Sequence, residues 1–220
     1  MTNRTPPARL TRRQREKLVA TLRARGIADE RVVAAVGAVQ RHRLMDDGFQ
    51  QRAYLDEALP IGLAQTISQP HTVARMTELL APRPGDRVLE VGTGSGYQAA
   101  ILSELGARVF SVERHADLLR RTAGRLDALG YKVRTRAGDG TYGWPGYAPF
   151  DGIVVTAGSP TVHAELVDQL RAPKDGRPDA RLVIPVGPPE AQVLHRVTRT
   201  AGGDVTETFD GVVFVPLVRG

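Results

Sequence analysis

The sequence predicts an α/β fold built on a doubly wound, mostly parallel sheet, with helices before it and an antiparallel addition after it. Short apolar runs alternate with segments of helical periodicity from residue 87 onward. A glycine-rich turn follows the first run, and two alternating segments around a turn lie near the end of the chain. Alternating strands and helices favour right-handed parallel crossovers, whereas the final pair favours antiparallel strands at the sheet edge.

The part before the sheet predicts helices and loops. Apolar residues recur at helical spacing over residues 12–25, 30–41 and 71–80, so each segment is expected to form a helix with one buried face. Residues 44–61 lack such a period and predict loops. Residues 1–10 are expected to form a disordered basic tail.

Five apolar runs predict the parallel strands, at residues 88–91, 109–112, 133–137, 153–156 and 182–186. Helical patterns separate most of them, at residues 98–105, 116–129 and 163–170. The antiparallel pair is expected over residues 192–200 and 205–215, joined by the turn at 201–204.

Composition narrows the class of protein. The chain has 220 residues, 41% of them hydrophobic, which suffices for one domain with a sizeable core. With no cysteine it has neither disulfides nor thiolate metal sites, which is typical of a reducing cytoplasm. No apolar run approaches the roughly 18 residues of a membrane helix. The five histidines show no metal-ligand spacing, so no metal is expected.

Positive charge is concentrated at the start of the chain. Residues 1–25 carry a net charge of +7 against +6 for the whole chain, so the remainder sums to −1. This distribution is typical of a solvated helix face and tail, and no nucleic-acid partner is expected.

The glycine-rich turn predicts a nucleoside-type cofactor. Gly92, Gly94 and Gly96 follow an apolar run and precede a helical segment, so backbone and ligand can approach closely there. A dinucleotide fingerprint would need its third glycine where Tyr97 stands, and a phosphate-binding loop would need a lysine. An S-adenosyl-L-methionine site requires neither.

Three acids follow successive predicted strands. Glu90 ends the first, Glu113 ends the second and is placed to bind ribose hydroxyls, and Asp139 follows the third, where an adenine edge would lie. Ordinary capping acids in an α/β fold are the alternative. Three acids at successive strand ends favour a methyltransferase.

These residues resemble the protein-L-isoaspartate(D-aspartate) O-methyltransferase family over nearly the whole chain. The segments that carry the resemblance are residues 60–71 (PIGLAQTISQPH), 73–80, 88–98 (VLEVGTGSGYQ), 138–140, 148–156, 182–187 and 214–217. The resemblance implies a Rossmann-like class I methyltransferase fold, a cytoplasmic monomer, and repair of damaged aspartyl residues through a methyl ester and a succinimide. S-adenosyl-L-homocysteine would be the other product.

The resemblance also implies site residues. Ser68 would be the catalytic residue beside the substrate carboxylate, with Gln65, Thr66 and Val215 near the bound peptide. The cofactor would be held by Thr66, Ile67, Glu90, Gly92, Thr93, Gly94, Ser95, Gly96, Glu113, Arg114, Gly138, Asp139 and Gly140. One domain is implied over residues 11–220, with the N-terminal helices and active-site segment in 11–80, the cofactor-binding core in 81–200 and the C-terminal strand region in 201–220.

Ser68 has a second interpretation from its position alone. A serine two residues before Pro70 could cap the following helix. A serine hydrolase is disfavoured because Ser68 lies outside a G-x-S-x-G turn.

Three segments depart from the family pattern: residues 39–45, residues 158–160, and residues 171–180, which are several residues longer than expected. We expect them on the substrate side or on nearby loops. They leave open a methyltransferase that modifies ordinary aspartates in a ribosomally made peptide. A separate alternative is a cofactor-binding module without catalysis, which the Arg-rich N-terminus would tether to an acidic partner.

Overall fold

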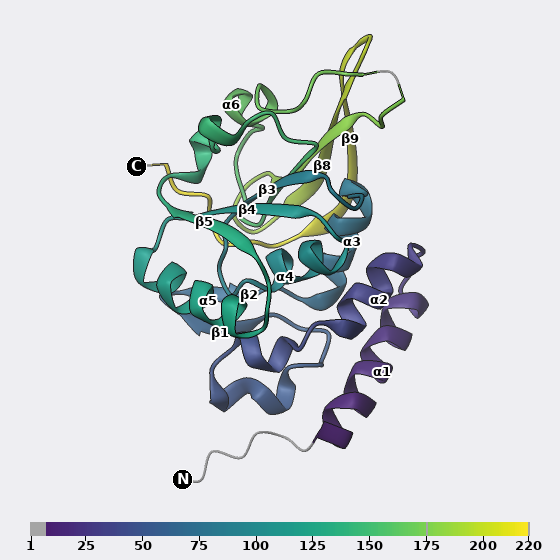
Figure 1. Cartoon of the computed structure of the whole chain (residues 1–220), viewed down its shortest axis with the longest axis vertical. Helices are drawn as coiled ribbons and strands as arrows, with labels where there is room; N and C mark the ends of the chain where they lie inside the picture. Colours follow the sequence, from purple (N-terminus) through teal and green to yellow (C-terminus); the bar gives the residue numbers. More distant parts are fainter. Residues whose placement is uncertain (1–7, 175, 220) are drawn as a thin grey trace.

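A seven-stranded sheet forms the centre of the computed structural model, which describes residues 8–174 and 176–219 (Figure 1). The strands are β3 (Arg87–Val91), β4 (Arg108–Glu113), β5 (Val133–Ala137), β6 (Gly152–Val155), β7 (Ala180–Val186), β8 (Gln192–Thr200) and β9 (Gly203–Val212). Their spatial order is β5-β4-β3-β6-β7-β8-β9. The first five are parallel, and β8 and β9 extend the sheet antiparallel.

The winding of the chain reverses at β3. Val88 of β3 pairs with Val109 of β4 on one side and with Gly152 of β6 on the other. The chain therefore winds outward from β3 in both directions, which opens a crevice at the carboxyl ends of β3 and β6. The glycine-rich turn lies at this switch point.

Alternating side chains give the sheet two apolar faces. Val88 and Val154 belong to the core on one face, whereas Leu89 and Ile153 belong to the core on the other. The first face is covered by α3 (Pro70–Leu80), α4 (Tyr97–Glu104) and α5 (Ala116–Ala128), and the second by α6 (Ala164–Val167) with the short helices η3 (Gly140–Tyr142) and η4 (Pro145–Tyr147). Both faces are thereby removed from water, as parallel sheets require.

The N-terminal elements extend the first of these cores. Helices α1 (Ala8–Ala24) and α2 (Glu30–Ala38) pack together through buried residues that include Leu22 and Val33. After them come η1 (Arg41–Leu44), η2 (Asp47–Arg52) and the hairpin of β1 (Leu59–Gly62) and β2 (Gln65–Ile67). This hairpin leads directly into the segment that contains Ser68.

The predicted fold class is confirmed, including the antiparallel pair β8–β9. Helix α1 begins at Ala8, earlier than expected and within the segment predicted to be disordered, while residues 1–7 lie outside the described part of the chain. The segment 44–61, predicted as loops, contains η2 and most of β1. Short 3₁₀ helices leave too few turns for a visible hydrophobic period.

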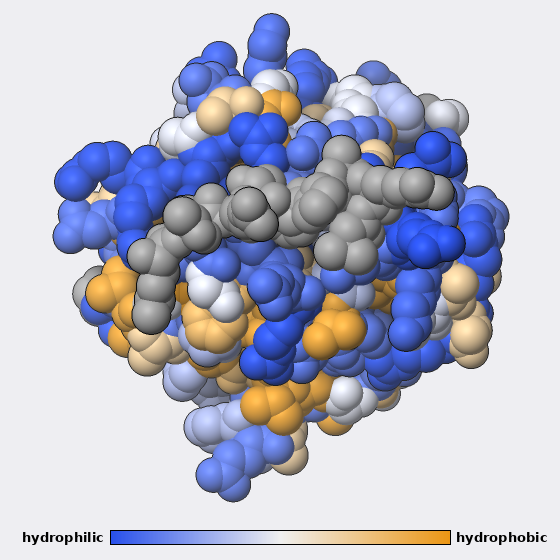
Figure 2. Space-filling model, turned by 90° about the horizontal axis from the view of Figure 1, so that it is seen from below, coloured by the Kyte–Doolittle hydropathy of each residue, from blue (hydrophilic) through white to orange (hydrophobic). Residues whose placement is uncertain are grey.

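No helix in the described residues is long and apolar enough to cross a membrane. Seen from below, the surface is mainly hydrophilic, and its apolar residues form small separate groups (Figure 2).

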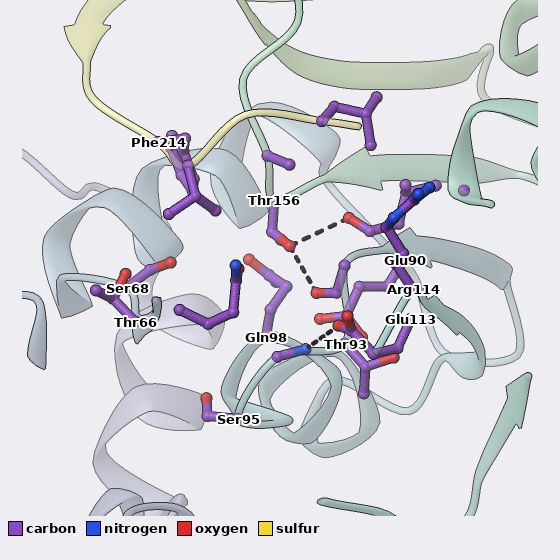
Figure 3. Close-up of a pocket in the computed structure, with 18 of the residues that line it drawn as sticks. Thr66, Ser68, Glu90, Thr93, Ser95, Gln98, Glu113, Arg114, Thr156 and Phe214 are labelled. Carbon is purple, nitrogen blue, oxygen red and sulfur yellow. Dashed lines mark hydrogen bonds between the residues drawn. The ribbon is translucent and has the colours of Figure 1, made fainter. Parts of the chain in front are cut away.

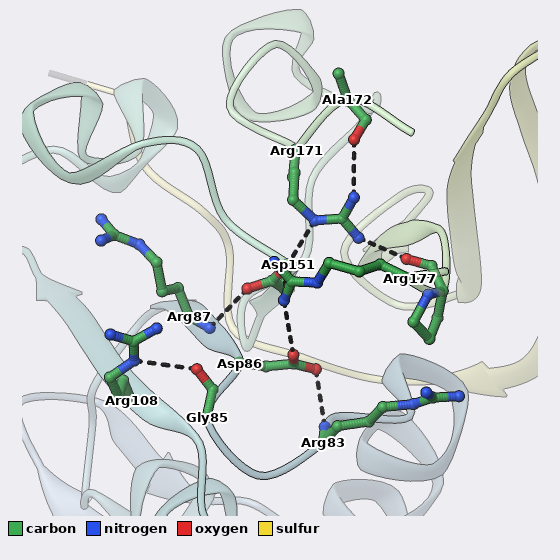
Figure 4. Close-up of polar contacts among 10 residues, drawn as sticks. Arg83, Gly85, Asp86, Arg87, Arg108, Asp151, Arg171, Ala172 and Arg177 are labelled. Atoms are coloured by element: carbon green, nitrogen blue, oxygen red, sulfur yellow. Dashed lines mark hydrogen bonds and ion pairs between the residues drawn. The ribbon is translucent and has the colours of Figure 1, made fainter. Parts of the chain in front are cut away.

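A cluster of ion pairs joins the amino ends of the parallel strands (Figure 4). The carboxylate of Asp151 accepts hydrogen bonds from Arg171 Nε at 2.7 Å and from the backbone N–H of Arg87 at 3.0 Å. The guanidinium of Arg177 lies 2.9 Å from the same carboxylate. Segment 171–180 therefore holds the start of β7 against the starts of β3 and β6.

This position corrects the expectation that segment 171–180 lies on the substrate side or on a loop near it. Because it precedes a strand that is parallel to β3, it lies at the amino edge of the sheet, opposite the carboxyl ends where the glycine-rich turn lies. The extra residues contribute contacts across the base of the sheet.

Replacing Asp151 with asparagine is expected to destabilise the fold in a pH-dependent way. Burial alone would raise the pKa of Asp151, but the Arg87 N–H and the two guanidinium groups outweigh it and lower the pKa below the usual value. Its stabilisation is therefore complete above the pKa of the unfolded chain, about 3.9, and is lost as the pH falls through the lowered value. Urea unfolding should show a loss of about 1.5–3 kcal/mol at pH 7.

The difference between Asp151→Asn and the wild type should shrink towards pH 3. Asp127→Asn, on the exposed side of α5, is the control and should change little at either pH. A loss that stays equal at both ends of the range would contradict an ionic origin.

Candidate active site

The turn between β3 and α4 is built from three glycines with left-handed backbones. Gly92, Gly94 and Gly96 have φ values of +97°, +50° and +83°. Side chains rarely tolerate this region, so the turn depends on glycine for its conformation. It ends at the N-cap of α4, where backbone N–H groups face the crevice.

Close neighbours also exclude a side chain at Gly92 and at Gly96. A Cβ on Gly92 would lie 2.5 Å from Thr156 Oγ1, at the end of β6. The Thr156 hydroxyl donates to the carbonyls of Gly92, at 2.6 Å, and Val91, at 3.1 Å (Figure 3). On the other side, a Cβ on Gly96 would lie 2.9 Å from Thr122 of α5. The turn is clamped between two elements and leaves its inner surface for a ligand.

Two buried carboxylates, Glu90 and Glu113, lie beside the turn. Glu113 accepts hydrogen bonds from the backbone N–H groups of Gly94 at 2.9 Å and His115 at 3.0 Å, so it also holds the turn in shape. Glu90 is fully buried and faces Ser111, its register partner on β4, whose hydroxyl donates to Oε2. Oε1 of Glu90 has no partner within the described chain.

The environment of Glu90 disfavours its charged form. Burial raises the pKa of Glu90 to about 8, the Ser111 hydroxyl opposes this increase, and the negative charge of Glu113 adds to it. A cationic group placed against Oε1 would favour ionisation and use the free oxygen. This position therefore suits a positively charged ligand.

Two neighbouring side chains, Tyr97 and Gln98, present further unpaired polar atoms to the same pocket. Gln98 is buried and donates through Nε2 to Thr77 at 2.9 Å, which leaves Oε1 without a partner in the described residues. The buried hydroxyl of Tyr97 is likewise unpaired there. A buried polar group without a hydrogen-bond partner costs free energy, so these atoms indicate a polar ligand. The carboxylate and amide acceptors fit the cationic amino and sulfonium groups of S-adenosylmethionine.

Ser68 lies where two cavities meet. It lines the pocket around the glycine turn together with Thr66 and Phe214, and all three also line an adjoining open groove. In Figure 3, Ser68 and Thr66 lie across the pocket from Glu113, with Gln98 between them. The remaining groove wall includes Asp56, Gln69, Thr72, Gln192, Val193 and Val213.

Ser68 does not cap the following helix. Helix α3 begins at Pro70 with Gln69 as its N-cap, and the N–H of His71 is bonded instead by Asp56 Oδ1 at 2.8 Å. The Ser68 hydroxyl has no hydrogen-bond partner among the residues that the structure describes. It is therefore available to a ligand.

The C-terminal segment closes one side of the pocket. Phe214 is held by Gln192, whose Oε1 accepts from the Phe214 N–H at 2.6 Å. The backbone beyond it pairs with Gly158, which donates to Val215 O at 2.8 Å and accepts from Leu217 N at 2.7 Å. Residue 158, in a segment that departs from the family pattern, thus anchors the pocket wall.

Most of the residues predicted for the site line this pocket. They are Gln65, Thr66, Ser68, Glu90, Gly92, Thr93, Gly94, Ser95, Glu113, Arg114, Gly140 and Val215. Four others lie outside its lining: Ile67, Gly96, Gly138 and Asp139. Asp139 caps η3: its Oδ1 accepts hydrogen bonds from the backbone N–H and from the hydroxyl of Thr141.

Sequence reasoning missed Tyr97, Gln98, Thr156 and Phe214 as pocket residues. The first two directly follow the glycines, and their place in the first turn of α4 was an available signal. Thr156 follows β6 and Phe214 follows β9, both far in sequence from the glycine turn, so no local pattern predicts that they line the pocket.

Glu90 is expected to make the protein's stability fall with rising pH. A carboxyl whose pKa rises on folding stabilises the fold most below the pKa of the unfolded chain, about 4.3, and this contribution is lost as the pH rises to the folded value near 8. Thermal unfolding of the ligand-free wild type should therefore show decreasing stability from pH 5 to pH 8. Glu90→Gln, which cannot ionise, should flatten this dependence.

Glu104→Gln, an exposed carboxyl on α4, provides the control for the Glu90 experiment. It should retain the slope of the wild type. An unchanged slope in Glu90→Gln would show that Glu90 ionises normally in the folded protein.

Comparison with known proteins identifies the family. A model of the family "Protein-L-isoaspartate(D-aspartate) O-methyltransferase (PCMT)" matches residues 13–220. A protein-L-isoaspartate O-methyltransferase of Salinibacter ruber is 62% identical over 94% of this chain and 92% of its own, and one of Stenotrophomonas maltophilia is 48% identical over 96% and 91%.

Solved structures agree with this result. A protein-L-isoaspartate O-methyltransferase superposes with a TM-score of 0.81 at 28% identity, over 94% of this chain and 66% of the other. A β-aspartate methyltransferase from Plasmodium falciparum, in complex with S-adenosyl-L-homocysteine, has a TM-score of 0.77 at 25% identity, over 93% and 98%. The chain therefore belongs to the protein-L-isoaspartate(D-aspartate) O-methyltransferase family, whose members are S-adenosylmethionine-dependent methyltransferases.

Proposed function

We propose that this protein transfers a methyl group from S-adenosylmethionine to the free carboxylate of L-isoaspartyl or D-aspartyl residues in damaged proteins and peptides. An oxygen–methyl bond forms as the sulfur–methyl bond breaks, which leaves S-adenosyl-L-homocysteine. The methyl ester then closes to a succinimide when a backbone nitrogen attacks it and methanol leaves. The ring closure needs no enzyme group.

The position of Ser68 carries this proposal. It stands on the wall common to the glycine-turn pocket and the open groove, so a peptide carboxylate that enters from the groove would meet the pocket at this residue. Its hydroxyl is a neutral donor that can orient a carboxylate without holding it as an ion pair. A carboxylate is already ionised at neutral pH, so no general base is required.

Different pocket residues would bind different parts of the cofactor. S-adenosylmethionine, when bound, supplies a methyl group on a positively charged sulfur. The free oxygens of Glu90 and Gln98 would accept hydrogen bonds from its amino end, and Glu113 would accept from the ribose hydroxyls. The roles of Gly138 and Asp139 in binding adenine rest on the family resemblance. The chain contributes mainly by aligning the reacting atoms and excluding water.

The relatives reported above favour repair over the dedicated modification of a ribosomal peptide, because their names specify isoaspartate. The free hydroxyl of Ser68, between the pocket and the groove, favours catalysis over cofactor binding without catalysis. We further propose a cytoplasmic monomer that acts without nucleic acid. The cysteine-free composition and the confinement of excess positive charge to residues 1–25 support this part.

Two matched peptides, one with isoaspartate and one with aspartate at the same position, test the proposed substrate. Methyl transfer from labelled S-adenosylmethionine should occur with the isoaspartyl peptide alone. Equal methylation of the aspartyl peptide would support peptide modification, and methylation of neither would remove the proposed substrate class.

Ser68→Ala is expected to lower turnover on the isoaspartyl peptide at least tenfold, because the carboxylate loses its orienting donor. Cofactor affinity measured by calorimetry should change less than threefold, since Ser68 lies on the groove side. Ser103→Ala, whose hydroxyl bonds within α4 to Ala99 O, is the control and should retain turnover. A large loss of cofactor affinity in Ser68→Ala would show that Ser68 binds the cofactor, which contradicts its assignment to the substrate side.

A further inference from the structure

Arg41, in η1, carries a fully buried positive charge. Its guanidinium contacts no carboxylate in the described ion pairs, and its Nε has no hydrogen-bond partner there. Burial lowers the pKa of Arg41 and outweighs the opposing effect of nearby groups such as Tyr97 and Asp56. A buried cation, even one that is hydrogen-bonded, often stabilises a fold no more than a well-packed apolar side chain of similar volume does. Stability alone therefore does not account for an arginine at this position.

The guanidinium is satisfied by main-chain carbonyls from three separate segments. Nη1 donates to Ala53 O at 2.5 Å, and Nη2 donates to Glu57 O at 2.9 Å and to Ser68 O at 3.0 Å. These carbonyls lie at the end of η2, in the loop before β1, and in the segment between β2 and α3. One side chain thus fixes the backbone on both sides of the β1–β2 hairpin.

Arg41 also contacts the cofactor side of the site. Its Cζ lies 5.2 Å from the centre of the Tyr97 ring, in a cation–π arrangement. Tyr97 is the first residue of α4, directly after the glycine turn, and it lines the pocket. The buried guanidinium therefore connects the Ser68 backbone to the start of α4.

We propose that Arg41 is a positioning residue that sets where Ser68 stands relative to the glycine-turn pocket. The proposal rests on the function proposed above. The Ser68 carbonyl carbon is bonded to the Cα from which the side chain extends, so fixing this carbonyl restricts the direction of the Cα–Cβ bond. The planar fork of arginine can serve three carbonyls at once, whereas the single nitrogen of lysine cannot hold the same geometry.

Arg181, near the amino end of β7 and away from the pocket, offers a matched control. It is partly buried at the start of β7, donates through Nη1 to the carbonyl of Leu79 at 3.3 Å, and has an unpaired Nε in the described structure. Burial is the largest effect on Arg181 and also lowers its pKa. Arg181→Lys should perturb the fold in a similar way without touching the site.

The test compares Arg41→Lys with Arg181→Lys. Arg41→Lys should lower kcat on the isoaspartyl peptide at least tenfold and change the cofactor Kd, measured by calorimetry, less than threefold. Arg181→Lys should retain kcat within twofold even if its Tm falls as much as that of Arg41→Lys. If kcat falls equally in both variants at matched loss of Tm, Arg41 stabilises the fold generally and the proposal fails.

A readout that needs no turnover separates this proposal from the proposed function. Hydrogen exchange of the backbone amides of residues 65–69 should accelerate at least fivefold in Arg41→Lys and remain at the wild-type rate in Arg181→Lys. Unchanged exchange in both variants overturns the positioning role, whatever substrate the wild type methylates. Arg41→Gln, which is neutral and keeps two N–H donors, gives the same comparison if the lysine variant does not fold.

Discussion

The site depends on a turn in which Gly92 and Gly96 have no room for a Cβ. Residues 92–96 pass between Thr156 at the end of β6 and Thr122 on α5, with contacts that a Cβ would violate on both sides. Because β3 is the strand from which the chain winds both ways, this stretch lies at the open end of the crevice. The hydrogen bonds of Thr156 and Glu113 then fix the turn from two directions. The pocket floor is consequently formed before any ligand enters.

This arrangement requires the burial of ionisable groups. Glu90 is held without solvent and with one free oxygen, and Arg41 is held without a carboxylate partner. Each would be replaced by an apolar residue if only the free energy of unfolding mattered. Glu90 lines the pocket beneath the glycine turn, and Arg41 contacts two residues of the pocket wall, through the carbonyl of Ser68 and the ring of Tyr97. Both groups are therefore placed where a charged ligand and a precise distance are needed.

The sequence predicted features that depend on local pattern. Strands such as β3 and β4 are short apolar runs buried on both faces, and the glycines, Glu90 and Glu113 lie within or beside them. These patterns can be recognised from sequence alone because the residues that form them are neighbours in the chain. The family resemblance added Ser68, whose position two residues before Pro70 would by itself have suggested a helix cap.

Features produced by tertiary contact escaped prediction. Phe214 reaches the pocket only because β9 returns along the sheet edge and Gln192 clamps the backbone there. Segment 171–180 was expected near the substrate, yet the direction of β7 places it at the far edge. Arg41 lies in a 3₁₀ helix without periodicity, and its three carbonyl partners are 12, 16 and 27 residues away.

The position of Ser68 is thus set by contacts with different parts of the chain. Its carbonyl is fixed from behind by a side chain of η1, its neighbour Gln69 begins α3, and its hydroxyl remains free between the pocket and the groove. A hydroxyl that bonded to the helix would be rigid but unavailable. Fixing the backbone through the carbonyl leaves the hydroxyl free to bind a carboxylate while keeping it in place, which is the preorganisation that methyl transfer between two bound groups requires.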